Sequence, residues 1–223
     1  MSVVLVIAPH PDDEVLGVGG AILAHLSRKD TVHVAICTKG DAAHFGAEQV
    51  QKVQTEARAV HKLLGVSGSH FLDLPAARLD TLPGAEIHAA LQRVFDATHP
   101  DTVYLPHVGD VHRDHQLIFQ AGMVCCRPLA NRRPLRVLSY ETVSETDWYA
   151  PPSTPPFIPN VFVDITSFID RKLEACLAYE SQIRSSPDQR SIEGIRALAM
   201  TRGHSVGVPY AEAFMLIREV IGT

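Results

Sequence analysis

Short apolar runs alternate with longer segments of helical period along the first half of the chain. The runs are rich in β-branched residues, which favours buried strands, and they lie at 3–8, 32–37, 70–74 and 102–106. In the longer segments apolar residues recur every three or four positions, which predicts helices over about 16–29, 47–64, 83–97 and 113–126. This alternation predicts an α/β fold, with a Rossmann-like, mostly parallel sheet and helices on both faces.

The pattern changes beyond Ala130. Two further apolar runs predict strands at 136–142 and 161–165, and the segment between them holds five prolines in the eleven positions 150–160. Prolines at this density favour an extended, helix-free excursion. Further helices are expected from a cap at Thr166 or Ser167 to about Ser181, over 188–200, and from Pro209 to Ile221. Because no repeat and no second boundary interrupts the pattern, we expect one domain over 1–223.

Composition narrows the function classes. The chain has 223 residues, 46% hydrophobic and 20% charged, with a net charge of −5, which is an ordinary globular balance and disfavours a nucleic-acid partner. The N-terminal apolar run ends in acids and has no basic region before it, so we expect neither a secretory signal nor an integral membrane association. The cysteines lack a CxxC pair and lie in apolar surroundings, which favours buried thiols and a cytoplasmic protein: Cys37, Cys125, Cys126 and Cys176.

Polar clusters follow three of the predicted strands. They lie at 10–14, 38–41 and 107–115, directly after the first, second and fourth strands. Ligands of open parallel sheets bind outside the carboxyl ends of the strands. We therefore expect these clusters to meet at one edge of the sheet.

The first cluster, in PHPDDE, has three possible interpretations. Asp12 or Asp13 could cap the helix that begins near Glu14, since acids satisfy free N–H groups at a helix start. Phosphate binding is disfavoured, because the glycines that follow form no GxGxxG pattern and the acids would repel phosphate. The third interpretation is a metal site, because a histidine and a carboxylate three positions apart in a turn can face one cation. Only the metal-site interpretation gives a role to every polar residue of the cluster.

The second cluster, HVGDVHRDHQ at 107–116, can supply the missing ligand. His112 and His115 are three positions apart and so share one face at a helix start. The alternative is a helix capped by Asp110 or Asp114, with exposed histidines. Since a catalytic zinc site usually has three protein ligands and an open position, the two clusters at neighbouring strand ends together favour a metal.

PHPDDE, followed about a hundred residues later by DVHRDH, resembles the motif pair of the PIG-L/LmbE family of zinc-dependent de-N-acetylases. TKGDA, EARAVHKLLGV and RGHSVGVPYAEAF resemble further landmarks of that family. The resemblance implies an LmbE-like fold in which Zn²⁺ is held by His10, Asp13 and His115. It also implies that Asp12 is the general base and that His112 stabilises the oxyanion or acts as an acid. Two imidazoles and one carboxylate also accept other divalent metals.

Several neighbouring residues have two interpretations each. Glu14 suits the first turn of a helix or a contact to a metal ligand, and Asp110 is expected to support its loop. Asp114 could orient one of the histidine rings or be a surface carboxylate. Arg202 and Tyr210, in the closing landmark, could contact substrate or only pack the last helix.

One position departs from the family pattern. Many members carry an arginine three residues before the position of Glu56, and here that residue is Val53. This difference does not affect the zinc chemistry. It removes the arginine that contacts the substrate in some family members, so their substrate recognition does not carry over directly. Lys39 and Arg78 are alternative cations, and a further group is more typical of a solvated loop: Arg127, Arg132, Arg133 and Arg136.

These residues support three hypotheses. The first is a hydrolase that removes acetate from a small N-acetylated amino sugar or sugar conjugate. The second is a zinc amidase that cuts a larger amide, such as a thiol-sugar conjugate. The third is a non-catalytic module that uses zinc structurally or binds a sugar or nucleotide. It is disfavoured because a structural zinc site normally has four protein ligands, whereas three are expected here. The resemblance also implies a homo-oligomer, a trimer or a hexamer.

Overall fold

A computed structural model of the chain describes residues 1–128, 134–148, 150 and 153–221. Arg132 and Arg133, and positions 151–152 of the proline-rich segment, lie outside the described residues.

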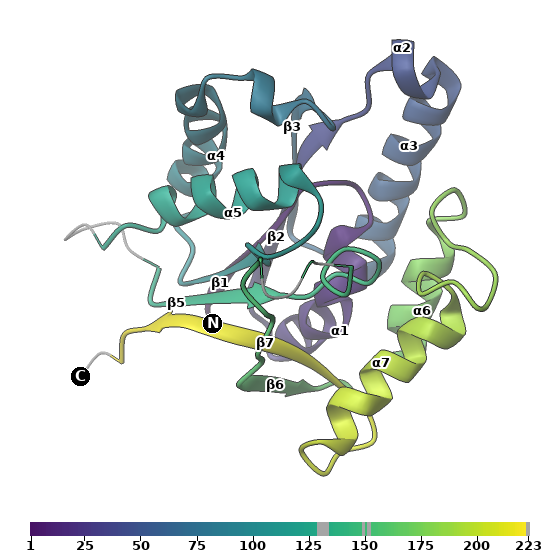
Figure 1. The fold of residues 1–223 in the computed structure, drawn as a ribbon. Helices are drawn as coiled ribbons and strands as arrows, with labels where there is room; N and C mark the ends of the chain where they lie inside the picture. The colour runs from purple at the N-terminus through teal and green to yellow at the C-terminus, as the bar shows by residue number, and fades with distance from the viewer. Residues whose placement is uncertain (129–133, 149, 151–152, 222–223) are drawn as a thin grey trace.

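One sheet runs through the protein (Figure 1). Its strands are β1 (Val3–Ala8), β2 (Thr31–Lys39), β3 (Gly68–Pro75), β4 (Thr102–Pro106), β5 (Arg136–Tyr140), β6 (Val161–Asp164) and β7 (Ala211–Glu219). They are arranged in the order β3-β2-β1-β4-β5-β7-β6. β3, β2, β1, β4 and β5 pair in parallel, whereas β7 is antiparallel to both of its neighbours.

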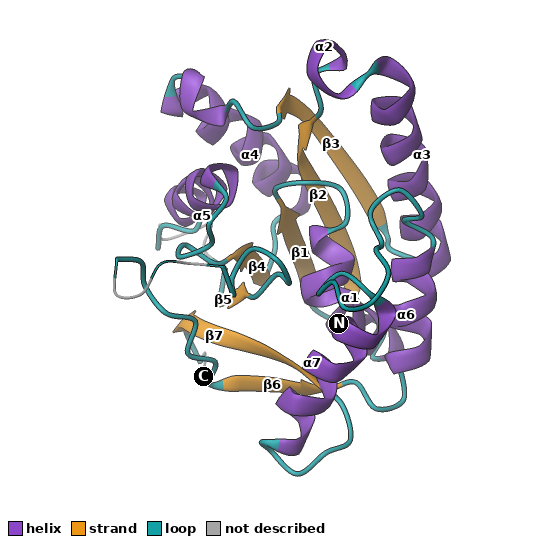
Figure 2. Ribbon diagram, turned by 45° about the vertical axis from the view of Figure 1, so that its right-hand side comes forward, coloured by secondary structure: helices purple, strands orange, loops and turns teal. Residues whose placement is uncertain are grey.

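Helices cover both faces of the sheet, as Figure 2 shows. One hydrophobic core joins the sheet to α1 (Asp13–Ser27), α3 (Ala47–Leu64), α6 (Ile169–Leu177) and α7 (Ile192–His204). The other joins it to α4 (Gly84–Thr98) and α5 (Arg113–Cys125). A short helix, α2 (Ala42–Phe45), and a 3₁₀ turn at Leu79–Thr81 complete the described helical segments. The predicted Rossmann-like α/β fold is confirmed, and the chain alternation that predicted it is observed from β1 to α5.

The end of the chain differs from the sequence prediction. Instead of a helix over 209–221, Ala211–Glu219 form strand β7 between β5 and β6. A short apolar run such as AFMLI fits either a helix or a strand, and here the unpaired edges of two strands decide the outcome. The helix predicted from a Thr166 or Ser167 cap to about Ser181 is shorter in the structure, where α6 begins after Phe168 and ends at Leu177.

The strand order determines where a crevice opens at the edge formed by the carboxyl ends of the strands. From β1 the chain moves outward to β2 and β3, then returns to the other side of β1 as β4. α1, which follows β1, and α5, which follows β4, lie on opposite faces of the sheet. The loops after these two adjacent strands therefore diverge and leave a crevice, which is where ligands bind in open α/β sheets.

β1, at the centre of this edge, is buried. Val4 to Ala8 are fully buried, because β1 is a central strand covered on both faces. Helix α1 is buried along almost its whole length, and Lys172 and Glu212 form an ion pair of 2.6 Å against it. The Glu212 carboxylate accepts hydrogen bonds from the N–H groups of Gly20 and Ala21, which compensates the burial of its charge.

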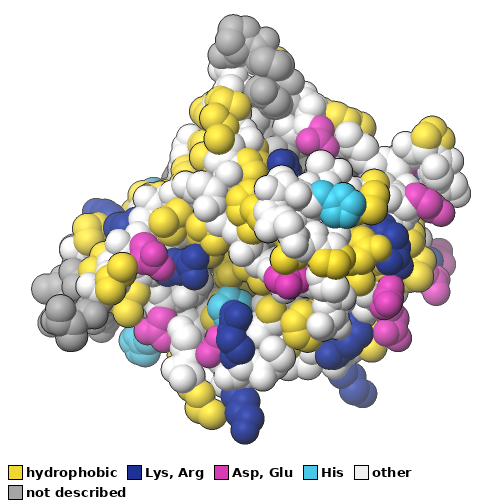
Figure 3. Space-filling model, turned by 90° about the horizontal axis from the view of Figure 1, so that it is seen from below, with side chains coloured by type: hydrophobic (Ala, Val, Ile, Leu, Met, Phe, Trp, Pro, Cys, Tyr) yellow, Lys and Arg dark blue, Asp and Glu magenta, His cyan; other side chains and the backbone are white. Residues whose placement is uncertain are grey.

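The distribution of charged side chains and the burial of the cysteines are as expected from the composition. Acidic and basic side chains are interspersed on the face shown in Figure 3. All four cysteines are buried free thiols, as predicted. Among the described residues, no helix has both the length and the apolar character needed to cross a membrane.

The close approach of α1 to β5 generates a stability prediction. A Cβ at Gly17 would lie 2.3 Å from Cδ2 of the buried Tyr140 and 2.8 Å from the backbone oxygen of Glu141. Gly17→Ala should therefore destabilise the protein by about 1–3 kcal/mol through overpacking. Gly84→Ala, at the open start of α4, is the matched control and should be neutral or slightly stabilising. Urea unfolding measures both, and equal stability of the two variants would contradict the close packing.

Candidate active site

Three potential metal ligands converge in the crevice between β1 and β4. His10 lies in the loop after β1, Asp13 is the first residue of α1, and His115 lies in the first turn of α5. Asp13 Oδ2 is 3.4 Å from His10 Nδ1 and 3.3 Å from His115 Nε2. The ligand atoms of the three residues all lie within 4.8 Å of one another, so one cation can contact all of them.

Two further carboxylates orient the histidine rings. Asp110 Oδ2 lies 2.8 Å from His115 Nδ1, and Asp114 Oδ2 lies 3.0 Å from His10 Nε2. A ring nitrogen that donates to a carboxylate carries the proton, so the other nitrogen keeps its lone pair. This leaves the lone pairs of His115 Nε2 and His10 Nδ1 on the side of Asp13. Both aspartates are buried and neither caps α5, which excludes the alternative of a merely capped helix.

The electrostatics of this cluster fit a cation. Among the described residues, His115 Nε2 is a buried atom without a hydrogen-bond partner. A lone pair that faces a carboxylate oxygen is repelled unless a positive charge lies between them. Although burial lowers the pKa of His115, the Asp13 and Asp110 carboxylates raise it to about 10. The cluster thus attracts either a proton or a metal ion at this point, and the donor set of two imidazoles and one carboxylate fits zinc.

A second grouping, His10, His112 and Asp114, also brings ligand atoms within 4.8 Å. Its carboxylate is already engaged, however. Asp114 Oδ2 contacts His10 Nε2 and accepts a 2.6 Å hydrogen bond from the N–H of Ala77. We therefore assign the candidate metal position to the first group.

Asp12 occupies the cap position of α1 without acting as a cap. Its φ is 111°, and its side chain makes no capping hydrogen bond, so the interpretation of Asp12 as a helix cap is wrong. A positive φ is strained for a residue other than glycine, and such strain is found at functional sites. Its backbone N–H donates to Glu14 Oε2 at 3.1 Å, and its Oδ2 accepts from Arg190 at 3.0 Å. Burial raises the pKa of Asp12 to about 8, although Arg190 lowers it.

Glu14 is fully buried and links Asp12 to the protein interior. Besides its bond to Asp12, it accepts a 2.5 Å hydrogen bond from the hydroxyl of Tyr179 and lies 3.4 Å from His61 Nε2. It makes no contact with a predicted metal ligand among the described hydrogen bonds. Glu14 therefore holds the strained turn at Asp12 rather than the ring of a predicted metal ligand.

His112 is placed as a hydrogen-bond donor. Its Nδ1 accepts from the backbone N–H of Asp114 at 3.1 Å, so in the neutral ring the proton is on Nε2. Burial and the neighbouring His10 lower the pKa of His112 to about 4. The ring lies 4.5 Å from that of His10, centroid to centroid. This geometry favours a neutral imidazole that donates a hydrogen bond over a protonated one.

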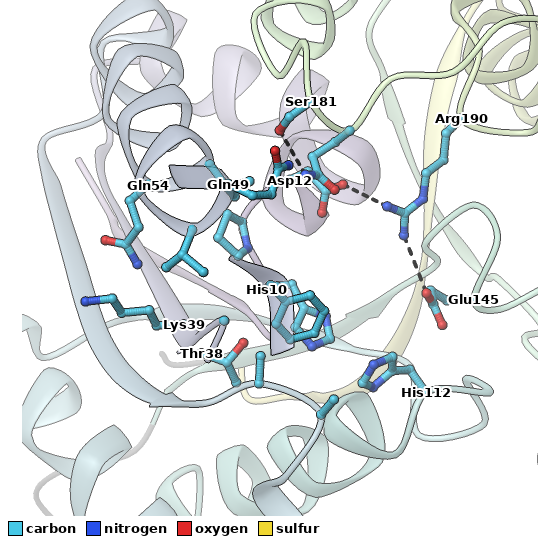
Figure 4. A pocket seen from close by; sticks show the side chains of 18 of the residues that line it. His10, Asp12, Thr38, Lys39, Gln49, Gln54, His112, Glu145, Ser181 and Arg190 are labelled. Atoms are coloured by element: carbon cyan, nitrogen blue, oxygen red, sulfur yellow. Dashed lines mark hydrogen bonds and ion pairs between the residues drawn. The ribbon is translucent and has the colours of Figure 1, made fainter. Parts of the chain in front are cut away.

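A cavity of about 430 Å³ opens beside these groups (Figure 4). His10, Asp12 and His112 are among its lining residues, and Lys39 and Arg184 add positive charge to the lining. Val53, the position of the missing arginine, also lines it, whereas Arg78 does not and instead pairs with Asp41. Apart from Glu145 and Arg190, the other lining residues are apolar or carry an amide or hydroxyl group: Pro11, Gly40, Phe45, Val50, Ala76, Ala77, Thr38, Gln49, Gln54, Ser181 and Gln182.

Arg202 and Tyr210 lie away from this cavity. Arg202 forms a bidentate ion pair with Glu141, at 2.8 and 2.5 Å, and neither it nor Tyr210 lines the cavity. The backbone oxygen of Tyr210 accepts from Ile165, next to β6. Of the two interpretations given for these residues, the structure favours packing.

Sequence reasoning missed Arg190 and Glu145, which both line the cavity. Arg190 contacts Asp12 from 178 positions away in the chain, and no motif surrounds it. The one available signal was the need of three consecutive acids, 12–14, for a cation, and that need does not say which arginine supplies it.

Comparisons with known proteins agree with the motif pair. Residues 5–126 match the family model described as PIG-L, GlcNAc-PI de-N-acetylase. The chain is 30% identical to the uncharacterized deacetylase YaiS of Escherichia coli strain K12, over 80% of this chain and 90% of the relative. It is 28% identical to the diacetylchitobiose deacetylase of Thermococcus kodakarensis, over 96% of this chain and 82% of that one.

A solved structure shows the same architecture. The conserved protein TT1542 from Thermus thermophilus superposes with a TM-score of 0.77 at 26% identity, and the match covers 100% of this chain and 98% of that chain.

The Asp110–His115 contact generates a prediction on metal affinity. Asp110→Asn should weaken zinc binding by about 10–100-fold, because an amide orients the His115 ring less well than a carboxylate. Competition with a chromogenic chelator measures the affinity. Asp170→Asn, at an exposed ion pair on α6, is the control and should bind zinc normally. An Asp110→Asn variant with unchanged affinity would contradict the role of Asp110.

Proposed function

Because the chain belongs to the PIG-L family of de-N-acetylases, we propose that it is a zinc-dependent deacetylase that removes the acetyl group from an N-acetylated amino sugar or sugar conjugate. The observation that carries the proposal is the convergence of the ligand atoms of His10, Asp13 and His115, because His10 also lines a cavity together with Asp12 and His112.

His10, Asp13 and His115 would hold the metal. A zinc ion held by three such ligands would act as a Lewis acid, polarising the amide carbonyl of the substrate and lowering the pKa of water to about 7. The orphaned lone pair of His115 Nε2 supports this donor set. Asp110 and Asp114 would keep the two rings in the tautomers that a metal requires.

Asp12 would act as the general base. Its carboxylate lines the cavity and is not engaged in capping α1, so it can take a proton from the attacking water. Its raised pKa, of about 8, suits a carboxyl that accepts a proton and returns it to the leaving amine. Such positioned proton transfer contributes typically about 10²–10⁴-fold to the rate.

His112 would stabilise the negative charge that develops on the amide oxygen. Since its Nδ1 is occupied by the N–H of Asp114, its Nε2–H is the available donor. A fixed neutral donor in a buried site contributes to catalysis without reorganisation during the reaction. This assignment selects oxyanion stabilisation over acid catalysis for His112.

The remaining expectations belong to this proposal. The substrate would be a small N-acetylated sugar, for which the cavity has the volume of an ordinary ligand pocket. The buried free thiols favour a cytoplasmic location, and the family resemblance favours a trimer or hexamer. Val53 argues for a substrate whose non-sugar part does not depend on the arginine at that position.

The first functional prediction concerns substrate and base together. The zinc-loaded protein should release acetate from at least one of a panel of free, phosphorylated, nucleotide-linked and thiol-linked N-acetyl sugars. Asp12→Asn should lower the rate by about 10²–10⁴-fold while it retains zinc, because only the proton acceptor is lost. Enzymatic acetate determination and metal analysis measure the two quantities.

Two outcomes would contradict the assignment. Full activity of zinc-loaded Asp12→Asn would remove Asp12 as the base. Release of an acid larger than acetate, identified by chromatography, would replace the deacetylase by the larger-amide hydrolase.

The second functional prediction concerns the metal. Dialysis against a chelator should abolish acetate release, and one equivalent of zinc should restore it, because the water nucleophile depends on the ion. His115→Ala should not be restored by the same addition, since it lacks a ligand. Activity that survives complete metal removal would exclude a metal-dependent reaction.

A further inference from the structure

We propose that Arg190 is a positioning residue for Asp12: its guanidinium holds Oδ2 of the carboxylate, so that Oδ1 is the oxygen that accepts the proton. The inference rests on the proposed function, in which Asp12 is the base. It goes beyond that function because it gives a role to a residue outside both motifs.

The contacts of Arg190 define its position. Its Nε donates to Ser144 Oγ at 2.7 Å, one terminal nitrogen to Asp12 Oδ2 at 3.0 Å, and the other to Glu145 Oε1 at 3.4 Å. Figure 4 shows the guanidinium between Asp12 and Glu145 at the side of the cavity. The arginine thus joins the loop after β1 to the segment after β5.

The segment that carries Arg190 is itself tied to the same place. Gln189 Oε1 accepts a 2.8 Å hydrogen bond from the N–H of Ser144, and the N–H of Arg190 donates to Asp188 at 2.8 Å. Ser191 then caps α7 through its hydroxyl. Two consecutive side chains, at positions 189 and 190, therefore hold one serine, which fixes where the guanidinium lies.

Asp12 has a specific need for such a partner. Its backbone is already held by Glu14, and its carboxylate is 4% exposed beside two further acids. Among the described residues, Arg190 is the hydrogen-bond donor to Oδ2, and none donates to Oδ1. A carboxylate with one oxygen fixed and the other free presents one defined acceptor, which the geometry of proton transfer requires.

Lysine could not replace this arrangement. The three acceptors of Arg190 lie on two segments, the loop after β1 and the segment after β5, and a planar guanidinium reaches them with separate N–H groups in a fixed fork. An ammonium ion is a point charge on a flexible stem, so it could neutralise Asp12 without fixing its rotation. The two variants Arg190→Ala and Arg190→Lys therefore separate charge from position.

The chain offers a matched control. Arg196 also pairs with an aspartate at 3.0 Å, Asp170, but this pair is on the surface and does not line the cavity. Arg196→Ala removes the same kind of interaction without touching Asp12. It should leave acetate release unchanged.

The experiment compares kcat and KM for acetate release by the zinc-loaded wild type and by Arg190→Ala, Arg190→Lys and Arg196→Ala. Asp12→Asn is included in the rescue measurement. Arg190→Ala should lower kcat by about 100-fold, the scale of a misplaced catalytic group, with KM changed less than about threefold. Arg190→Lys should recover little of that loss. Added guanidinium ion should restore part of kcat in Arg190→Ala and none in Asp12→Asn, whereas a purely structural defect would not respond to it.

Three results would overturn the inference. They are an Arg190→Ala variant as active as Arg196→Ala, a loss of activity accompanied by loss of zinc or of thermal stability and unaffected by guanidinium, and full recovery in Arg190→Lys.

A measurement without substrate separates this inference from the proposed function. A thermal double-mutant cycle of Arg190→Ala with Asp12→Asn should be non-additive, because each change removes the same ion pair. Additive melting temperatures would overturn the pairing even if the protein proved to be an active deacetylase. If wild type released no acetate from any sugar, the proposed function would fail, and the cycle would still decide whether Arg190 acts on Asp12.

Discussion

The site depends on the Asp13 carboxylate, which lies between two imidazoles in a buried position. Its Oδ2 is within 3.4 Å of both His10 and His115, and it is 1% exposed. A charge buried this deeply is stable only beside a compensating charge. A proton or a cation between Asp13 and the two rings supplies that charge, and the buried aspartates 110 and 114 keep the rings turned toward it. The first turns of α1 and α5 are held together by the same constraint.

The neighbouring turn at Asp12 extends this arrangement to catalysis. A strained backbone persists only when its surroundings over-determine it. Glu14 holds the backbone N–H of Asp12, and Tyr179 holds Glu14, so the strain is supported from the interior. Arg190 holds the carboxylate from the cavity side. Both the backbone and the carboxylate of the proposed base are thus fixed, and its side chain does not cap α1.

The fold explains why these groups can meet and the cavity explains what can reach them. The divergence of the chain after β1 and β4 creates a crevice on any sheet with this strand order. The lining of that crevice is particular to this chain. Valine at position 53 removes a cation found in many family members, and Lys39, Arg184 and Arg190 supply positive charge from other directions. The chemistry of the candidate metal ligands and the choice of substrate are therefore separable properties of the site.

The sequence by itself determined the strands and the long helices from β1 to α5 and the two motifs, because hydrophobic period and ligand spacing are local. Helix α3 was predicted with its observed bounds, and the residues expected to form a metal site do converge. The structure decided what depends on distant partners. β7 is a strand because β5 and β6 flank it. The side chain of Asp12 does not cap α1, because the turn at Asp12 has a positive φ. His112 is a neutral donor because its Nδ1 accepts from the N–H of Asp114. Arg190 reaches Asp12 only through the folded chain, since a contact over 178 positions leaves no periodicity or spacing in the sequence.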